Sequence, residues 1–591
     1  MKKILLREYW QFLWRYLAPQ RKATLFMVVL LLTSIVLQLI GPQVARSFID
    51  AAQQRAPEQT LIWAAIVFIL VSIAQQAMNL LATYWSERVS WTATNALRAD
   101  LVAHLIRLDL GFYKTRTPGE LIERVDGDVN ALAKFFSSFV VKLVGNVLLL
   151  IGILVALSLI DLRLGLAFTT LSLLALVVLK RVRQFALPYI RKDREWSAIF
   201  FGYIGEVLTS TEDLRSNGAV PYAMRRFFGY LRNWMPVMRR ARVLGDTVWM
   251  TAIAIFAVGD AMSYWFGGSL YRGGSVSLGV VYVVIAYITM LAEPIETIRV
   301  QLQELQRADA GITRVRELLE ITSKLRNGPY SIPSEGALSV EFRGVSFAYD
   351  DGAPPSDDMA EERKTVLKNV SFKVEAKHML GLVGRTGSGK TTIARLLFRF
   401  YDPQDGQVCV DGVDLRQANI AALRSRIGLV TQDVQLFEAS LRDNITFFDA
   451  SIRDQQVLAV LETLGLHSWL ERLPDQLDTL VSGAKLSAGE AQLIALARVL
   501  LKDPGLIILD EASSRLDPAT EALLDQALGR LLKSRTVIII AHRLMTLERA
   551  DEILILEHGQ VIEHGSREQL ITDPRSTFAE LRRAGMGEVL L

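Results

Sequence analysis

Six long apolar segments in the first half of the 591-residue chain constrain its fold more than any other feature. A helix needs about 20 apolar residues to cross roughly 30 Å of hydrocarbon. The segments therefore predict six membrane-spanning helices, the shorter ones extended by their flanking residues. The predicted spans lie within residues 23–45, 61–86, 143–160, 164–179, 247–271 and 273–292.

Basic residues are concentrated in alternate loops between these spans. The N-terminal segment and the long loops at 87–130 and 180–246 are rich in Lys and Arg, whereas the short loops between the other spans carry few. Cytoplasmic loops of membrane proteins are enriched in Lys and Arg. We therefore expect a multi-pass protein of the plasma membrane with both termini in the cytoplasm. Bare coil of this length is uncommon, so the long loops are expected to continue the spans as helices.

A glycine-rich sequence follows a short apolar strand in the second half. Residues 380–383 lead into G-R-T-G-S-G-K-T at 384–391, and a helical segment follows. In this strand–loop–helix context, G-x-x-x-x-G-K-[ST] binds nucleotide phosphates through its backbone N–H groups and the helix N-terminus. Lys390 is expected to bridge the β- and γ-phosphates, and Thr391 to bind Mg²⁺. The expected ATP-binding residues are Gly384, Arg385, Thr386, Gly387, Ser388, Gly389, Lys390, Thr391 and Thr392.

A second apolar strand, at residues 506–509, ends in two carboxylates, Asp510 and Glu511. Ligands of open α/β sheets bind at the carboxyl ends of the parallel strands. Asp510 is expected to hold Mg²⁺ through water, and Glu511 to polarise the attacking water. Because phosphoryl transfer needs a phosphate cradle, a metal and a water-orienting group, the two motifs together predict an ATPase that uses ATP and Mg²⁺.

Composition excludes several other classes of protein. The single Cys409 excludes an intrachain disulfide and a cysteine-clustered metal site. A net charge of only +4 gives no general basic field, so no nucleic-acid partner is expected. The expected fold is multidomain: an all-α six-helix transmembrane domain at 1–320, a linker at 321–337, and an α/β P-loop ATPase domain at 338–591.

Additional motifs accompany the phosphate loop in a characteristic order: V-S-F-A-Y at 345–349, V-T-Q-D at 430–433, L-S-A-G-E at 486–490, S-R-L-D-P at 514–518 and I-A-H-R at 540–543. With these motifs the chain resembles the ABC transporter superfamily. It is most similar to exporter-type half-transporters, in which membrane and ATPase domains are fused. The resemblance implies that Tyr349 stacks on adenine and that Gln432 senses Mg²⁺ and meets the membrane domain. It also implies that Asp517 contacts the dimer partner and that His542 contacts the γ-phosphate. The catalytic set is then Glu511, His542 and Gln432, and the metal set is Thr391, Gln432 and Asp510.

The family's signature motif is altered in this chain. Residues 486–490 read L-S-A-G-E where the family has L-S-G-G-Q. The resemblance implies that Ser487 and Gly489 contact the γ-phosphate bound to the partner's phosphate loop. Ala488 adds a methyl group where the backbone must approach phosphate, and Glu490 adds a carboxylate that repels a triphosphate unless it is screened. The preceding residues 479–485 also lack the family's Gly-Glu-x-Gly.

Intact hydrolytic residues beside an altered signature resemble one half of a heterodimeric multidrug-type exporter. We expect a second, non-identical half-transporter with an intact signature opposite Glu511. The expected activity is ATP-driven export or flipping of a hydrophobic or amphipathic small molecule, lipid or peptide across the bilayer by alternating access. A homodimer that tolerates the substitutions is one alternative, and a regulatory subunit that binds ATP without moving cargo is another.

Other features concern coupling and cargo. Residues 111–129 and 205–226 resemble the family's two coupling segments, which transmit ATPase closure to the membrane domain. Asp260 lies inside the fifth span, where a carboxylate is a candidate for contact with cationic cargo. The alternative is a place near the outer headgroups or in an ion pair. The aromatic residues expected to contact cargo, or alternatively to pack and anchor, are Trp249, Tyr264, Trp265, Tyr282 and Tyr287. An acidic stretch at 351–364 is expected to be a surface loop.

Overall fold

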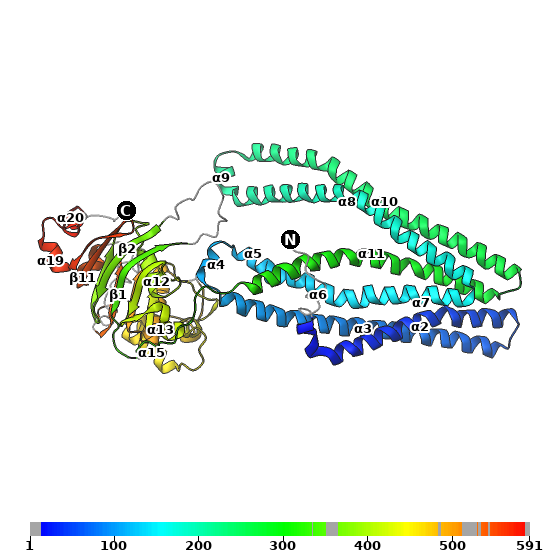
Figure 1. The fold of residues 1–591 in the computed structure, drawn as a ribbon, viewed down its shortest axis with the longest axis horizontal. Helices are drawn as coiled ribbons and strands as arrows, with labels where there is room; N and C mark the ends of the chain where they lie inside the picture. Colours follow the sequence, from blue (N-terminus) through cyan, green and yellow to red (C-terminus); the bar gives the residue numbers. More distant parts are fainter. Residues whose placement is uncertain are drawn as a thin grey trace. The chain divides into compact units, whose positions relative to one another are not determined.

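The computed structural model describes residues 14–333, 335–349, 365–482, 486–510, 529, 534–541 and 544–584. The chain forms two compact units, one helical and one built around sheets (Figure 1). The first unit contains Met1–Ile106 and Pro118–Ile321. The second contains Thr322–Leu591 together with the short segment Arg107–Thr117. This segment belongs to the sheet-containing unit by its contacts, although in the sequence it lies between two parts of the first unit.

Long helices make up the first unit. Within the described residues, six helices are long and apolar enough to span a membrane, as the sequence predicts. Several are 48 to 53 residues long, well beyond the bilayer's need of about 20, so they continue past the hydrocarbon. The six spans lie in α2 (Arg21–Gln53), α3 (Glu58–Ile106), α7 (Gly145–Ile160), α8 (Leu162–Thr209), α10 (Val220–Arg272) and α11 (Leu278–Glu320). The span that contains α7 begins earlier, at Lys142, and the span within α11 is Leu278–Ile298.

Short helical segments precede α2 or connect the six helices. The connecting elements are η1 (Ala18–Gln20), α4 (Leu110–Lys114), α5 (Pro118–Ile122), η2 (Glu123–Asp128), α6 (Val129–Ser138), η3 (Phe139–Val144) and α9 (Thr211–Ser216). Helices α2 and α3 run side by side, and so do α8 and α10 (Figure 1). Buried side chains from α2, α3, α7, α8 and α11 form a core in this unit, and its fully buried members include Ile153, Leu157, Leu164, Phe168 and Val283.

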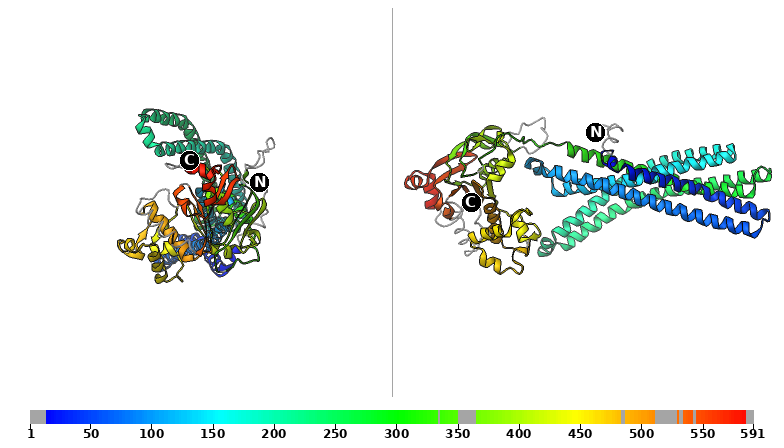
Figure 2. Two further views of the ribbon diagram at one scale, coloured as in Figure 1. Left: turned by 90° about the vertical axis from the view of Figure 1, so that its left-hand side faces the viewer. Right: turned by 90° about the horizontal axis from the view of Figure 1, so that it is seen from below.

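A largely parallel sheet organises the second unit (Figure 2). Its strand order is β12-β11-β3-β10-β9-β6, in which only β12 pairs antiparallel. The strands are β3 (Met379–Val383), β6 (Ile427–Val430), β9 (Leu506–Asp510), β10 (Thr536–Ile540), β11 (Glu552–Glu557) and β12 (Gln560–Ser566). A four-stranded antiparallel sheet, in the order β2-β1-β4-β5, contains β1 (Val340–Ala348), β2 (Thr365–Val374), β4 (Asp405–Val410) and β5 (Val413–Asp414). A small third sheet pairs β7 (Ala439–Ser440) with β8 (Leu480–Val481).

The parallel strands are apolar along their length because both faces are covered. In β9, Ile507 and Leu509 face one hydrophobic core, and Leu506 and Ile508 face another. The helices of the unit are α12 (Lys390–Leu397), α13 (Ile420–Arg426), α14 (Leu441–Thr446), α15 (Asp454–Thr463), α16 (His467–Glu471), α17 (Ala488–Lys502), α19 (Arg567–Thr572) and α20 (Thr577–Ala584), with 3₁₀ turns η4 (Leu415–Gln417), η5 (Gln476–Asp478) and η7 (Leu544–Arg549). The six membrane helices and this α/β unit agree with the predicted fold class.

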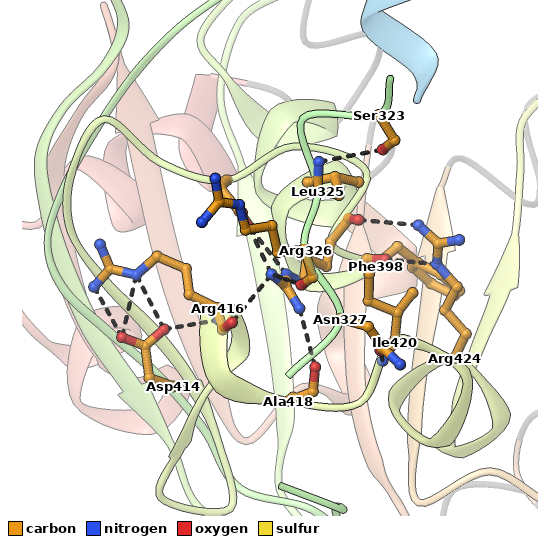
Figure 3. A network of polar contacts seen from close by, with 12 residues as sticks. Ser323, Leu325, Arg326, Asn327, Phe398, Asp414, Arg416, Ala418, Ile420 and Arg424 are labelled. Carbon is orange, nitrogen blue, oxygen red and sulfur yellow. Dashed lines mark hydrogen bonds and ion pairs between the residues drawn. The ribbon is translucent and has the colours of Figure 1, made fainter. Parts of the chain in front are cut away.

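Polar contacts of Arg326 and Asn327 hold the start of the expected linker to the rest of the second unit (Figure 3). Arg399, two residues after the end of α12, is 1% exposed. Its guanidinium donates to the carbonyl oxygens of Arg326 at 2.8 Å and Ala418 at 3.0 Å, and to the Asp402 carboxylate at 3.0 Å. Burying a charge is tolerated when its hydrogen bonds are satisfied in this way. The start of the linker, at Arg326, is therefore bonded to Arg399, which follows the phosphate-loop helix α12.

Candidate functional site

Four neighbouring parallel strands end at one edge of the main sheet. Strands β6, β9, β10 and β3 pair in parallel, so their carboxyl ends point the same way. The phosphate loop follows β3, Gln432 lies two residues after β6, and β9 ends at Asp510. Three predicted residues, Glu511, Asp517 and His542, lie outside the described residues. Ligands of such sheets bind at this edge, so the topology brings the separate motifs of the sequence into one region.

The phosphate loop has a backbone that only glycine allows at two positions. Gly389 has φ 109°, and a side-chain carbon there would lie 2.5 Å from Leu367. Gly384 has φ 155°, and the same atom there would lie 2.2 Å from the carbonyl oxygen of Leu556. Left-handed backbone of this kind is costly for other residues. The glycines of the motif therefore produce a tight loop in which backbone N–H groups can approach a phosphate.

Polar groups inside this loop fit a phosphate ligand. The Lys390 side chain is 5% exposed, and its ammonium donates to the carbonyl oxygens of Gly384 at 2.5 Å and Arg385 at 3.1 Å. The Ser388 hydroxyl is buried and, among the described residues, makes no hydrogen bond. A buried polar atom without a partner is costly, and a phosphate oxygen would supply one. A nucleoside triphosphate therefore fits this cradle.

Oxygen atoms suited to Mg²⁺ come from three elements near the same edge. Thr391 lies in the first turn of α12, Gln432 lies after β6, and Asp510 ends β9. Thr391 and Gln432 are exposed, and Asp510 is partly buried. Hydroxyl, amide and carboxylate oxygens are the ligands that Mg²⁺ takes from proteins. The donor set fits this metal, which the sequence predicted.

Tyr349 directly follows β1 of the antiparallel sheet and lies beside the phosphate-loop helix. Its hydroxyl is 3.1 Å from the Thr392 hydroxyl and accepts a hydrogen bond of 3.0 Å from Arg395, both on α12. The backbone just before it is fixed by Gln404, whose amide oxygen and nitrogen bond both backbone polar groups of Ala348. The predicted adenine-stacking residue and the predicted phosphate loop are thus adjacent. Arg395 has no part in the sequence prediction, because nothing in its local pattern distinguishes it from a surface arginine.

The altered signature forms a closed helix cap. Ser487 is the N-cap of α17, and its hydroxyl accepts from the amide of Glu490 at 3.2 Å. In return, the Glu490 carboxylate accepts from the Ser487 amide at 2.8 Å and the Ser487 hydroxyl at 2.9 Å. The indole N–H of Trp469 donates to the other carboxylate oxygen at 2.8 Å. This reciprocal arrangement is a capping box, which satisfies N–H groups that a helix N-terminus leaves unpaired.

The same contacts determine the charge of Glu490. Burial raises the pKa of this carboxyl, but the hydrogen bonds from Ser487 and Trp469 outweigh burial and hold the pKa below its usual 4.5. The carboxylate is therefore ionised at neutral pH. Trp469 was not predicted from the sequence, since it lies 21 residues before its partner on a separate helix.

A groove lies next to Gln432 in the second unit. Its volume is about 770 Å³, and it runs between the end of β6 and helices α14 and α17. Its lining combines aromatic and polar side chains, including Thr431, Asp433, Phe437, Phe447 and Arg498. Phe437 and Phe447 are about half exposed, so this surface is apolar and accessible.

The membrane-unit candidates fall into two groups. Tyr287 is 1% exposed, and its hydroxyl donates to the carbonyl oxygen of Leu39 at 2.8 Å and accepts from Gln43 at 3.1 Å. It packs inside the unit, which agrees with the alternative of packing that the sequence left open for these aromatic residues. The other expected aromatics are exposed on the first unit: Trp249, Tyr264, Trp265 and Tyr282. Asp260 is partly buried on α10, and the described residues include no ion pair to it.

Both halves of the chain match known proteins. Residues 24–295 match the family described as ABC transporter transmembrane region, and residues 367–514 match ABC transporter. An ATP-dependent lipid A-core flippase of Coxiella burnetii is 30% identical over 566 residues, which cover 93% of this chain and 91% of the flippase. The chain belongs to the ABC transporter family. It is an exporter-type half-transporter and a multi-pass membrane protein whose ATPase domain binds ATP and couples its hydrolysis to transport.

Two further comparisons agree with this assignment. A probable multidrug resistance ABC transporter of Bacillus subtilis, YheH, is 32% identical over 483 residues, which cover 80% of this chain and 70% of YheH. The structure of a bacterial Atm1-family ABC exporter with ATP bound superimposes with a TM-score of 0.78 and 26% identity, covering 97% of this chain and 99% of that one. The resemblance inferred from the motifs is confirmed at the level of the exporter family.

Proposed function

We propose that this chain is the catalytically competent half of a heterodimeric exporter, and that a non-identical partner supplies a working signature. The observation that carries the proposal is the closed cap of α17. The Ser487 hydroxyl donates to the Glu490 carboxylate at 2.9 Å, so its proton is already committed within the chain. A hydrogen bond to an ionised acceptor is about twice as strong as a neutral one. A phosphate presented by another chain would have to break it.

A glutamine at position 490 would accept from Ser487 through its neutral amide oxygen, because both Glu and Gln serve in capping boxes, but its NH2 group could not accept the hydrogen bond of Trp469. The substitution therefore keeps the fold of the loop and changes its charge. A full negative charge near the start of α17 opposes the helix dipole's attraction for a second anion. The site that uses this signature is accordingly proposed to bind ATP and to turn over slowly.

The site that uses this chain's own phosphate loop is proposed to perform hydrolysis. Lys390 and the loop hold the phosphates, and Thr391, Gln432 and Asp510 hold Mg²⁺, which neutralises charge on the transferring phosphoryl group. Glu511 orients the attacking water, His542 contacts the γ-phosphate, Tyr349 stacks on adenine, and Asp517 meets the partner chain. Ser487 and Gly489 face the partner's nucleotide.

The cargo is proposed to be hydrophobic or amphipathic, a drug-like molecule, lipid or peptide that is moved across the plasma membrane. The names of the multidrug and lipid A-core relatives support this class for an exporter of the same build. Both termini are proposed to be cytoplasmic, where the ATPase meets ATP.

The decisive experiment measures Mg-ATPase activity of the chain reconstituted in lipid, alone and with a candidate non-identical half-transporter. Activity that needs the partner supports the heterodimer. Comparable activity of the chain alone contradicts it and means that residues 486–490 are a working signature.

Glu511→Gln in the active assembly should abolish cargo transport while ATP binding remains. Unchanged transport would contradict the assignment of Glu511 to hydrolysis.

A further inference from the structure

A short helix from the first half of the sequence packs on the expected adenine-binding aromatic. Helix α4, part of the segment Arg107–Thr117, belongs to the second unit. Gly111 and Lys114 lie one helical turn apart, so they share a face. A side-chain carbon at Gly111 would lie 3.8 Å from the Tyr401 ring, and the Lys114 ammonium lies 3.2 Å from the centre of the Tyr349 ring. This face of α4 therefore rests on Tyr349 and Tyr401.

Other residues of the second unit also contact the ring of Tyr349. Phe347 and Tyr401 contact it in edge-to-face geometry, with ring centres 4.9 and 5.3 Å away. Arg395 donates to its hydroxyl, and its guanidinium carbon lies 5.8 Å from the ring centre. Two cations thus act on one aromatic ring, and one of them, Lys114, covers a face at van der Waals distance. A cation over an aromatic face is attracted by the ring's quadrupole.

We propose that Lys114 is a positioning residue that links the occupancy of Tyr349 by a purine base to the position of α4. Lys114 lies on one face of the ring, and in this proposal the base of the nucleotide stacks on the opposite face. The proposal rests on the proposed function, in which Tyr349 stacks on adenine. A ring fixed and polarised by the ammonium is a better platform for an electron-rich purine, so the two contacts strengthen each other.

Thermodynamic linkage makes this relation reciprocal. If Lys114 strengthens base stacking, then the base must hold Lys114, and hence α4, more firmly against Tyr349. The segment that carries α4 is followed directly by Pro118–Ile321 of the membrane unit. Nucleotide binding would therefore change how firmly α4 is held, and α4 leads into the membrane helices. The effect would act through Lys114, which does not contact the phosphates.

The test compares Lys114→Met with wild type in the reconstituted full chain. Methionine keeps the length and apolar stem but removes the charge. We expect ATP and ADP to bind about two- to fivefold more weakly, the range of an exposed cation–π contact, while inorganic tripolyphosphate binds as before. Lys114→Arg should restore ATP affinity. Arg116→Met is the matched control, because it removes a cation of the same segment that lies over Phe112 instead.

A second readout follows α4 itself. Hydrogen exchange of amides 110–114 should slow when ATP binds to wild type, and this protection should be smaller in Lys114→Met. Tighter ATP binding by Lys114→Met would mean that the lysine competes with the base and would overturn the proposal. Equal weakening of ATP and tripolyphosphate would also overturn it, because Lys114 would then act on phosphate charge. Failure of wild type to bind ATP, or normal binding by Lys390→Ala, would instead contradict the proposed function.

Discussion

Helices α12 and α17 both begin at loops that the proposed mechanism brings to phosphate, but their N-termini differ. Gly389 precedes α12 with φ 109° and provides no side-chain cap. Ser487 precedes α17 and, with Glu490, closes a capping box to which Trp469 donates a further hydrogen bond. A helix N-terminus attracts anions through its unpaired N–H groups and dipole. Whether it is available to an external phosphate thus depends on whether the chain's own carboxylate already occupies it.

The N-terminus of α12, which has no side-chain cap, is called the open terminus below. Loss of Lys390, the cation proposed to bind phosphate there, should have the largest effect on ATP hydrolysis. Lys390→Ala removes the ammonium that lies inside the loop, so charge on the transferring phosphoryl group loses a stabilising partner. We expect ATP hydrolysis to fall at least about 100-fold, the cost of removing one preorganised donor from such a site. Lys368→Ala, an exposed lysine on β2, is the control and should retain activity. Retained activity of Lys390→Ala would mean that the chain's own phosphate loop is not the working one.

The N-terminus of α17, capped by Ser487 and Glu490, is called the closed terminus below. Weakening this cap should raise ATP hydrolysis rather than lower it. The double variant Ala488→Gly and Glu490→Gln restores the family's signature and replaces an ionised acceptor by a neutral one. A change of about 1 kcal/mol in the hydrogen bond to Ser487 corresponds to about fivefold in rate. We expect Mg-ATPase of the chain without a partner to rise by about that factor. Each single variant shows which substitution matters, and no rise in the double variant would favour a homodimer that tolerates both.

Removal of the N-cap hydroxyl separates a structural role of Ser487 from a catalytic one. Ser487→Ala should lower stability by about 1 kcal/mol, the usual cost of losing a Ser cap, and change ATPase activity with the partner by less than about twofold. Ser440→Ala is a matched control, because Ser440 caps α14 through an equivalent bond to Asp443. Thermal unfolding and ATPase assays measure the two effects. A loss of activity of tenfold or more in Ser487→Ala alone would make residues 486–490 a working signature.

The sequence predicted the open terminus well because its chemistry is local. The spacing of Gly384, Gly389 and Lys390 defines strand, loop and helix within a few residues, and the apolar strands 380–383 and 506–509 indicate the parallel sheet that unites the motifs. The six spans were equally predictable, because crossing a bilayer requires about 20 apolar residues in sequence.

The closed terminus could be predicted only in part. Glu490 three residues after Ser487 is the pattern of a capping box, but the sequence was interpreted by charge alone, as a repulsive carboxylate. Its third donor, Trp469, comes from another helix, and such tertiary contacts have no sequence period. The same reason explains Lys114 and Tyr349, which are 235 positions apart, and Tyr287, whose aromatic ring is compatible with either packing or cargo contact.

The smallest expected effect is the pH dependence of the Glu490→Gln variant relative to wild type. It tests whether the start of α17, unlike that of α12, carries an ionised carboxylate. Because the folded pKa of Glu490 is lowered below its usual 4.5, the carboxylate stays ionised from pH 6 to pH 8. The stability that its hydrogen bonds contribute is present above pH 4.5 and is lost only as pH falls through the lowered folded pKa. The ratio of Mg-ATPase activities of Glu490→Gln and wild type should therefore be constant between pH 6 and pH 8, whatever the pH profile of each. The difference in thermal unfolding temperature between Glu490→Gln and wild type should shrink only below pH 4.5. An activity ratio that approaches one toward pH 6 would show that Glu490 takes up a proton there, and that burial, rather than the donors at the start of α17, controls its charge.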